Sequence, residues 1–287
     1  MPANKTADAV AATNAAGKVK VPAAQRTILL LQALGRASAP MTAQALATRI
    51  NMPRSSTYQL LEVLESAGFV VHFPEEKRWS LGVAAFELGT AYLRHDPLER
   101  LAQPLLTRLL GQVGTLQPEG FPAVAQLGIL SGAELLYLLK GATAAHSSDN
   151  QGVITDVGVR LPAHLTASGR SMLAIYDRSQ LRATYPGGLD TALVRRTEVG
   201  PATIRDLNQL LAAERAAGFS TETGMVSAGY SSVAAAARNH LGLPIAAFAV
   251  TFRTDRLDTE TAAKMQTAIA SLAVKAATEL TRRLGSK

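Results

Sequence analysis

Residues 41–82 read MTAQALATRINMPRSSTYQLLEVLESAGFVVHFPEEKRWSLG, and this stretch decides the fold. It begins with a short helical pattern, which a turn separates from a second and longer one. Pro53 suits the first position of the second helix, where its missing N–H would have no partner, and Gly68 suits the position just past its end. Two short apolar segments, residues 70–71 and 79–81, then predict a hairpin. The stretch is therefore expected to fold as helix, turn, helix and hairpin.

The second predicted helix has an apolar face and a polar face. Its apolar face follows the i, i+3, i+4, i+7 spacing of a helix that packs on a core. The residues with this spacing are Thr57, Leu60, Leu61 and Leu64. Hydroxyls, an amide and a cation lie elsewhere on the helix, and such groups contact the phosphates and base edges of DNA. These predicted contact residues are Arg54, Ser55, Ser56, Tyr58 and Gln59. The pattern is that of a winged helix-turn-helix, which places its second helix in the major groove.

The tip of the predicted hairpin, residues 74–78, is polar. Lys77 and Arg78 are expected to contact a phosphate or the minor groove, as the wing of such a module does. An ordinary amphipathic helix followed by a solvated hairpin would show the same pattern, so this second interpretation stays open on the pattern alone.

Composition gives broad limits on the class of protein. The chain has 287 residues, of which 47% are hydrophobic, and this is enough for two domains and a sizeable core. Its net charge is +7. Residues 1–95 carry ten Lys and Arg against six Asp and Glu, whereas residues 96–287 carry nineteen against sixteen. The denser positive charge at the N-terminal end favours a polyanionic partner, although basic proteins without nucleic-acid partners are common.

The chain contains no cysteine, which excludes a disulfide framework and any thiolate site. No apolar run approaches the length of a membrane span, and the first twenty residues lack the apolar core of a signal peptide. We therefore expect residues 1–21 to form a disordered arm and the protein to be cytoplasmic, with no membrane partner and no cofactor.

The remaining chain is expected to form a linker and a larger domain. Residues 84–96 predict a linker helix, and exposed aromatic residues on it, Phe86 and Tyr92, suggest a dimer contact. From residue 123 strands alternate with helices, including a short strand at residues 153–159. This alternation indicates an α+β domain with helices packed on one face of a sheet.

These features, taken together, resemble the IclR family of bacterial transcriptional regulators over residues 22–284. The family's recognition helix typically reads LPKSTxxRLL, and residues 52–61 read MPRSSTYQLL. The wing closes with WSLG at residues 79–82, and the family signature GxxLPxHxxAxGK appears as GVRLPAHLTASGR at residues 158–170. Residues 215–220 then read RAAGFS, followed by an acidic residue, a glycine and SSVAA. Several motifs in the right order are far more specific than any one of them.

The resemblance implies a fold and a function. The fold is an N-terminal winged helix-turn-helix over residues 22–83, the linker helix over residues 84–96 and a C-terminal GAF-like α/β effector-binding domain over residues 97–287. The function is sequence-specific binding of double-stranded DNA at a palindromic operator by a homodimer or homotetramer. A small-molecule effector, an organic or aromatic acid, modulates that binding. Such a protein is a regulator and not an enzyme.

Alignment with the family motifs also implies an effector site. Its expected lining residues are Val153, Leu161, Ala167, Ser168, Glu222, Ser232, Ala249 and Thr251. Ser168 stands at an expected helix N-terminus, which favours an anionic or polar ligand group. Ser232 and Thr251 add hydroxyls on the sheet. Because the carboxylate of Glu222 would repel an anionic ligand, we expect a ligand with both an acidic and a hydroxyl end.

The chain departs from the family pattern at three places. Gln59 stands where the family usually has Arg, and Gln favours adenine over guanine. Arg170 replaces the usual Lys, which reads as a mild change. Residues 115–122 fit the family poorly, so the entry to the first strand is expected to be rebuilt.

Two other classes of function remain as alternatives. A metal-dependent or hydrolytic enzyme would use the C-terminal pocket, and His146, Asp149 and Asp156 are the candidate ligands. The chain lacks Gly-x-Ser-x-Gly, Walker A and Gly-x-Gly-x-x-Gly motifs, which argues against this class. A pure dimerisation scaffold is the other alternative. His164, in the family signature, either orders the loop at the pocket mouth or is a satisfied structural histidine.

Overall fold

The computed structural model describes residues 21–35, 37, 39–95, 97–116, 122–143, 156–255 and 257–285. The chain divides into two compact units, residues 1–95 and 96–287. Each unit has its own hydrophobic core. Several predicted features lie outside the described residues. They are the N-terminal arm up to residue 20, Val153, His146, Asp149, the side chain of Tyr92 and most of the segment 115–122.

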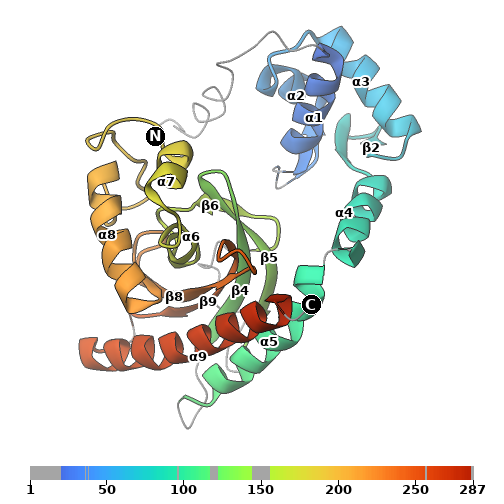
Figure 1. Ribbon diagram of the computed structural model, residues 1–287. Helices are drawn as coiled ribbons and strands as arrows, with labels where there is room; N and C mark the ends of the chain where they lie inside the picture. Colours follow the sequence, from blue (N-terminus) through green and yellow to red (C-terminus); the bar gives the residue numbers. More distant parts are fainter. Residues whose placement is uncertain are drawn as a thin grey trace. The chain divides into compact units, whose positions relative to one another are not determined.

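The N-terminal unit has the predicted order of helix, turn, helix and hairpin (Figure 1). Its elements are α1 (Pro22–Gly35), β1 (Met41–Thr42), α2 (Ala43–Arg49), α3 (Arg54–Ser66), β2 (Val70–Phe73), β3 (Arg78–Leu81) and α4 (Val83–His95). The hairpin of β2 and β3 gains a third strand, the short β1, which the sequence pattern did not predict. The winged helix-turn-helix prediction is confirmed.

Helix α3 packs as its periodicity predicts. Thr57, Leu61 and Leu64 are buried, and their neighbours in the core include Leu46 of α2 and Trp79 of β3. One detail was wrong: Pro53 is the residue before the helix and not its first residue, since its ψ of 141° is extended. The missing N–H of proline removes no helical hydrogen bond in either position.

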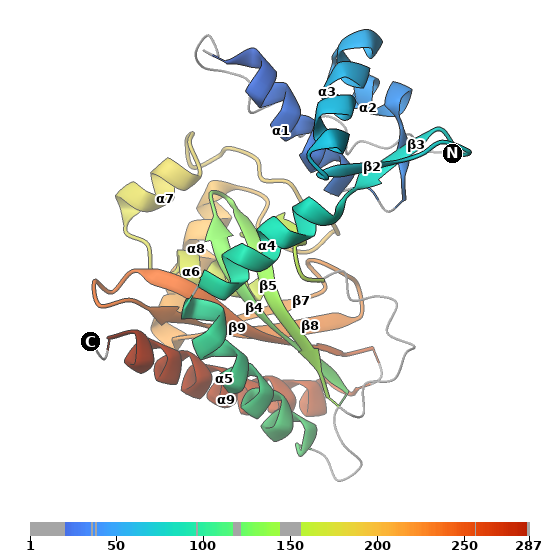
Figure 2. The same cartoon turned by 90° about the vertical axis from the view of Figure 1, so that its right-hand side faces the viewer.

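The C-terminal unit is built around a six-stranded antiparallel sheet (Figure 2). Its helices are α5 (Pro97–Gly114), α6 (Ala167–Leu173), α7 (Arg178–Thr184), α8 (Ile204–Ala217) and α9 (Thr259–Gly285). Its strands are β4 (Ala123–Ser131), β5 (Glu134–Ala142), β6 (Arg160–Pro162), β7 (Ser220–Thr223), β8 (Tyr230–Arg238) and β9 (Pro244–Arg253). The strand order is β6-β5-β4-β9-β8-β7.

Helices cover both faces of this sheet, which corrects the expectation that they pack on one face. Val233 and Val250 pack with residues of α5 and α9 in one core. Ala234 and Ala249, their neighbours along the same strands, instead pack against Ala167 of α6. Since successive strand residues point to opposite faces, α6 and α9 lie on opposite sides. We call the face that α6 covers the inner face.

Local capping signals in this unit behave as the sequence predicts. Thr203 caps the start of α8 in a capping box with Asp206, and Gly218 caps its end in the left-handed conformation at φ 79°. The prediction of a strand at residues 153–159 was wrong for residues 156–159, the part of this segment that the structure describes. Residues 156–159 form a turn around Gly158, whose φ is 83°, and the strand is β6 instead.

No helix among the described residues combines the length and the apolar composition needed to cross a membrane.

Candidate DNA and effector sites

The predicted DNA contacts on α3 are open to solvent. Arg54, Ser55, Tyr58 and Gln59 are exposed, and Ser56 is half-buried. No side chain caps the start of the helix, because Pro53 occupies the capping position. The first-turn N–H groups of α3 therefore lack a side-chain cap, and a helix N-terminus of this kind attracts anions.

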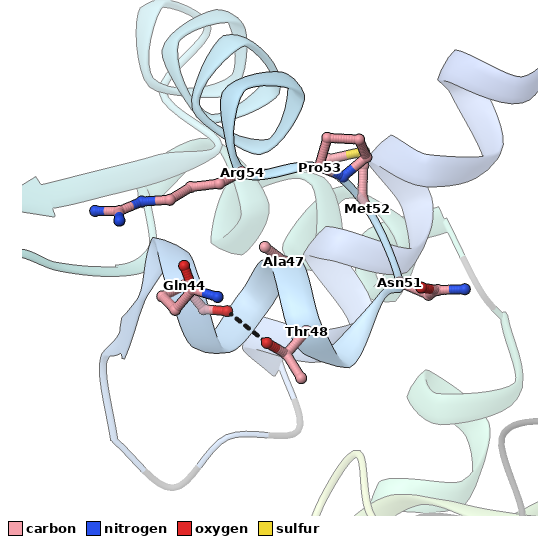
Figure 3. A pocket seen from close by; sticks show the side chains of 7 residues that line it. All are labelled: Gln44, Ala47, Thr48, Asn51, Met52, Pro53 and Arg54. Carbon is pink, nitrogen blue, oxygen red and sulfur yellow. Dashed lines mark hydrogen bonds between the residues drawn. The ribbon is translucent and has the colours of Figure 1, made fainter.

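A surface hollow lies beside the start of α3, between that helix and α2 (Figure 3). It is lined by Gln44, Ala47, Thr48, Asn51, Met52, Pro53 and Arg54. The Thr48 hydroxyl donates to the Gln44 carbonyl within α2, 3.1 Å away. Asn51 makes the turn between the helices with a φ of 50°, a conformation that asparagine adopts more readily than most residues.

The hollow gathers groups that suit a phosphate oxygen. The residues that line it include Gln44, Thr48, Asn51 and Arg54, whose amides, hydroxyl and guanidinium are groups that proteins use to contact DNA phosphates. The sequence interpretation included Arg54 but missed Gln44, Thr48 and Asn51. Their polar side chains on α2 and the turn look like a solvated helix surface until the fold places them beside α3.

The two basic residues of the wing differ in their contacts. Lys77 lies at the exposed tip of the hairpin with a φ of 53°. The Arg78 guanidinium donates to the Pro40 carbonyl at 2.7 Å and lies 3.9 Å from the Glu76 carboxylate. Arg78 therefore helps to hold the wing in place, while it remains partly exposed.

The inner face of the C-terminal sheet carries a row of polar side chains. Glu222 on β7 lies opposite Ser232 on β8, which lies opposite Thr251 on β9. Residues directly opposite one another in paired strands share a face. The Ser232 and Thr251 hydroxyls are 2.9 Å apart, and the Thr251 hydroxyl donates to the Gln126 amide oxygen at 3.4 Å. The row therefore crosses four strands, and the sequence interpretation missed Gln126.

Helix α6 and strand β6 bring the other predicted effector residues to this face. Ala167 of α6 contacts Ala249 of β9. Leu161 of β6 belongs to a neighbouring cluster with Tyr137 of β5. The structure thus gathers the seven described residues of the predicted effector site on or beside the inner face.

The Glu222 carboxylate is buried and bonded to its own chain. It accepts hydrogen bonds from the backbone N–H groups of Met225 and Val226, at 2.6 and 3.1 Å. Burial raises the pKa of Glu222, whereas these two bonds, the Ser232 hydroxyl and the charge of Arg170 favour its ionised form. The carboxylate therefore orders the turn after β7 as well as facing the inner face.

The start of α6 is less open to an anion than the sequence suggests. Helix α6 has seven residues, and the Thr166 side chain already accepts from the Gly169 N–H at 3.0 Å. The Ser168 side chain lies near that of Tyr137, a buried residue. Burial raises the pKa of Tyr137, and the negative charge of Glu222 raises it further. An anion bound at Ser168 would therefore lie close to a carboxylate.

Arg170 is more than the mild replacement expected from the sequence. Its side chain is fully buried, and Nε donates to the Glu214 carboxylate at 2.9 Å. Its other nitrogens donate to the carbonyl oxygens of His164 and Thr221. Burial raises the pKa of Glu214, and the Arg170 charge opposes that shift. The side chain therefore ties α6 to α8 and β7.

His164 has the contacts of a structural histidine. It is buried, and Nε2 donates to the Val194 carbonyl at 2.8 Å. Burial lowers the pKa of His164, the bond to Val194 opposes this, and the positive charge of Arg170 lowers it further. The neutral ring therefore anchors the loop that contains Val194.

The candidate metal ligands do not form a site within the described residues. Asp156 is the candidate that the structure describes, and its carboxylate lies 2.5 Å from Lys140 Nζ. No group of three His, Cys, Asp or Glu side chains in the described ranges is arranged to hold a metal ion.

A winged helix-turn-helix followed by an α/β domain is the architecture of a DNA-binding regulator that responds to a small molecule. Two family profiles match the chain: "IclR helix-turn-helix domain" over residues 23–73 and "Bacterial transcriptional regulator IclR C-terminal" over residues 90–278. The chain belongs to the IclR family of bacterial transcriptional regulators.

Curated relatives and solved structures agree with this assignment. The HTH-type transcriptional repressor AllR of Klebsiella pneumoniae is 27% identical over 238 residues, which is 82% of this chain and 81% of that protein. The acetate operon repressor of Salmonella typhimurium is 24% identical and covers 96% of this chain and 94% of its own length. These relatives identify a regulator rather than an enzyme.

Two crystal structures of family members share the fold. The regulator from Alicyclobacillus acidocaldarius gives a TM-score of 0.77 at 21% identity, with 93% of this chain and all of that chain covered. An IclR homologue from Microbacterium hydrocarbonoxydans, complexed with 4-hydroxybenzoate, gives a TM-score of 0.70 at 22% identity, with coverage of 91% and 99%.

Proposed function

We propose that this regulator acts in the cytoplasm as a homodimer, or as a homotetramer, on a palindromic operator. Helix α3 reads the operator, and an organic or aromatic acid bound at the inner face changes the affinity for it. The observation that carries the proposal is the placement of polar groups. Polar side chains are exposed along α3, and a second set forms a buried or half-buried row on the inner face.

The DNA contacts follow from the chemistry of the exposed groups. Ser55 and Gln59 face base edges, and a glutamine in this position pairs with adenine. The Arg54 guanidinium and the hollow beside it hold a backbone phosphate, which fixes the register of the helix on the duplex. Ser56 and Tyr58 add contacts along the same helix. Lys77 and Arg78 place the wing on the neighbouring backbone or minor groove.

Helix α4 supplies a surface for a second copy of the chain. Val83, Phe86 and Leu88 are 66%, 73% and 64% exposed. Large apolar side chains exposed at this level on one helix are typical of an interaction surface. Helix-turn-helix proteins read two half-sites through two-fold symmetry, so a dimer matches a palindromic operator.

The effector binds between α6 and the sheet. The hydroxyls of Ser232 and Thr251 orient the ligand, and Ala249 lies on the same face, packed against Ala167. Leu161 supplies an apolar wall, which ligand pockets commonly have. Ala167, Ser168 and Glu222 complete the lining. Ligand binding then shifts the population between two arrangements of the dimer that differ in operator affinity.

Selection of operator sequences tests this proposal. Purified full-length protein is used to enrich a pool of random DNA duplexes, and the enriched sequences are aligned. The expected result is two inverted half-sites whose centres lie about one helical turn, roughly 10 base pairs, apart or a multiple of it. Enrichment of a single unrepeated site would contradict the dimer on a palindrome, and a lack of any enrichment would contradict sequence-specific binding.

A further inference from the structure

Lys140 lies on the inner face, beside the polar row. It is paired in register with Gln126, whose amide oxygen accepts from the Thr251 hydroxyl. A bulge in the pairing of β4 with β5 lets both Leu138 and Leu139 pack into the core on the other face. The strand then returns to its alternation, and Lys140 shares the inner face with Gln126.

The ion pair of Lys140 is partly exposed to solvent. Its Nζ lies 2.5 Å from a carboxylate oxygen of Asp156, and the two side chains are 28% and 75% exposed. Exposed pairs of this kind contribute little to stability, because water competes for both charges. Arg170, by contrast, is held by the buried Glu214 and by two carbonyl groups. Lys140 is therefore the more accessible of these two cations.

An acid bound near Lys140 meets a cation, whereas an acid bound near Ser168 meets the negative charge of Glu222, which raises the pKa of Tyr137. Lys140 lies on β5 and Thr251 on β9, which are two strand spacings apart in the sheet. Measured along the sheet this is about 10 Å, a distance that a lysine side chain and a ring-sized acid together span.

We propose that Lys140 is the specificity-determining residue for an acidic effector, whose carboxylate replaces Asp156 as its partner. The other end of the ligand reaches the hydroxyls of Thr251 and Ser232. This inference rests on the proposed function, in which an acid binds the inner face. It places the acid at the β5 end of the polar row and not at the start of α6.

Calorimetry with matched acids and amides tests the role of Lys140. The probes are 4-hydroxybenzoate with 4-hydroxybenzamide, benzoate with benzamide, and lactate with lactamide, each titrated into the full-length protein. At least one acid is expected to bind the wild type about 10-fold tighter than its amide, a typical worth of a charge-assisted contact. Lys140→Met should abolish this preference, Lys140→Arg should keep it, and Asp156→Asn should strengthen it.

Lys264 provides a matched control. It forms an exposed pair with Glu260 on α9, at 2.6 Å, so Lys264→Met should keep the acid preference. An unchanged preference in Lys140→Met would overturn the inference, as would equal binding of every acid and its amide. Binding of an operator is measured on the same samples. A wild type that binds operator but no acid overturns the role of Lys140 alone, whereas failure to bind any operator overturns the proposed function itself.

Discussion

Two arginines show how the two units of this protein differ. Arg54 starts α3 on the surface of the N-terminal unit, whereas Arg170 in α6 is fully buried in the C-terminal unit and paired with Glu214. The exposed side chain of Arg54 needs no partner within the protein, because water solvates its charge. The buried side chain must be satisfied by the chain itself. We therefore expect that surface substitutions in the first unit can change DNA binding without changing the stability of the fold, whereas substitutions of buried charges in the second unit change its stability.

The largest expected effect is on the free energy of unfolding, when each arginine is replaced in turn by methionine, a residue of similar length. Arg170→Met should lower the free energy of unfolding by about 3–5 kcal/mol, because Glu214 is left buried without its partner. Arg54→Met should change it by about 0.5 kcal/mol or less, as exposed substitutions do. Urea denaturation followed by circular dichroism measures both.

A double variant sharpens that comparison. Arg170→Met combined with Glu214→Leu removes both charges and should recover part of the loss, since no buried charge then remains unpaired. The single tryptophan, Trp79, belongs to the N-terminal core. Its fluorescence should therefore show a smaller loss of stability for Arg170→Met than circular dichroism does. An Arg170→Met protein as stable as the wild type would show that the buried pair does not hold α6 in place.

The next effect concerns association of two copies. Val83→Glu with Leu88→Glu should weaken the dimer by about 3 kcal/mol or more, since burying one such apolar side chain is worth about 1.5–3 kcal/mol. Sedimentation velocity at micromolar concentration should show a dimer for the wild type and a monomer for the variant. Val63→Glu, on an exposed residue of α3, serves as the control. A monomeric wild type would refute the assignment of α4 as an interface.

Substitutions on α3 should have effects of about 1–3 kcal/mol. Ser55→Ala and Gln59→Ala should each reduce discrimination between the operator and an unrelated duplex by that amount if they touch bases. Arg54→Ala should weaken binding to both duplexes alike and lower the salt dependence if its guanidinium touches a phosphate, as we propose. Fluorescence anisotropy with Glu65→Ala as the control measures these changes. Unchanged affinity in all three variants would remove α3 from the groove.

The smallest effect is the pH dependence from Glu222. Its pKa lies above the ordinary value of 4.5 because the carboxyl is buried, so the native state holds this proton more tightly than the unfolded state. Stability from this group is therefore lost as pH rises from about 4.5 through the raised pKa. Glu222→Gln should be more stable than the wild type at pH 8, with the difference vanishing toward pH 4.5. Thermal melts across this range would contradict the interpretation if the difference stayed constant.

The same contrast explains what the sequence predicts well. The helix-turn-helix and its wing lie within one continuous stretch, and local rules place their elements, such as the left-handed Gly68 after α3. In the larger unit, Thr203 and Gly218 likewise mark the ends of α8. The sequence is therefore enough to predict the ends of an element when the groups that define those ends are only a few residues apart.

The inner face depends on pairing between distant residues. The contact of Thr251 with Gln126 joins positions 125 apart in sequence, and that of Arg170 with Glu214 joins positions 44 apart. Periodicity does not reveal which strands are neighbours, so Gln126, Tyr137 and the contacts of Arg170 were not predicted. The family motifs supplied the other residues of this face.

The most direct test of the effector site is to measure operator affinity with and without an acid that binds the protein. Fluorescence anisotropy of a labelled operator from the selection gives this affinity for the wild type and for two variants. The acid should change the operator affinity of the wild type. Ser232→Leu should bind the operator like the wild type but lose the response, because the larger side chain fills the inner face. Arg54→Ala should bind the acid normally but the operator weakly. An unaltered acid response in Ser232→Leu, or a wild type whose operator affinity ignores the bound acid, would contradict an effector site on the inner face.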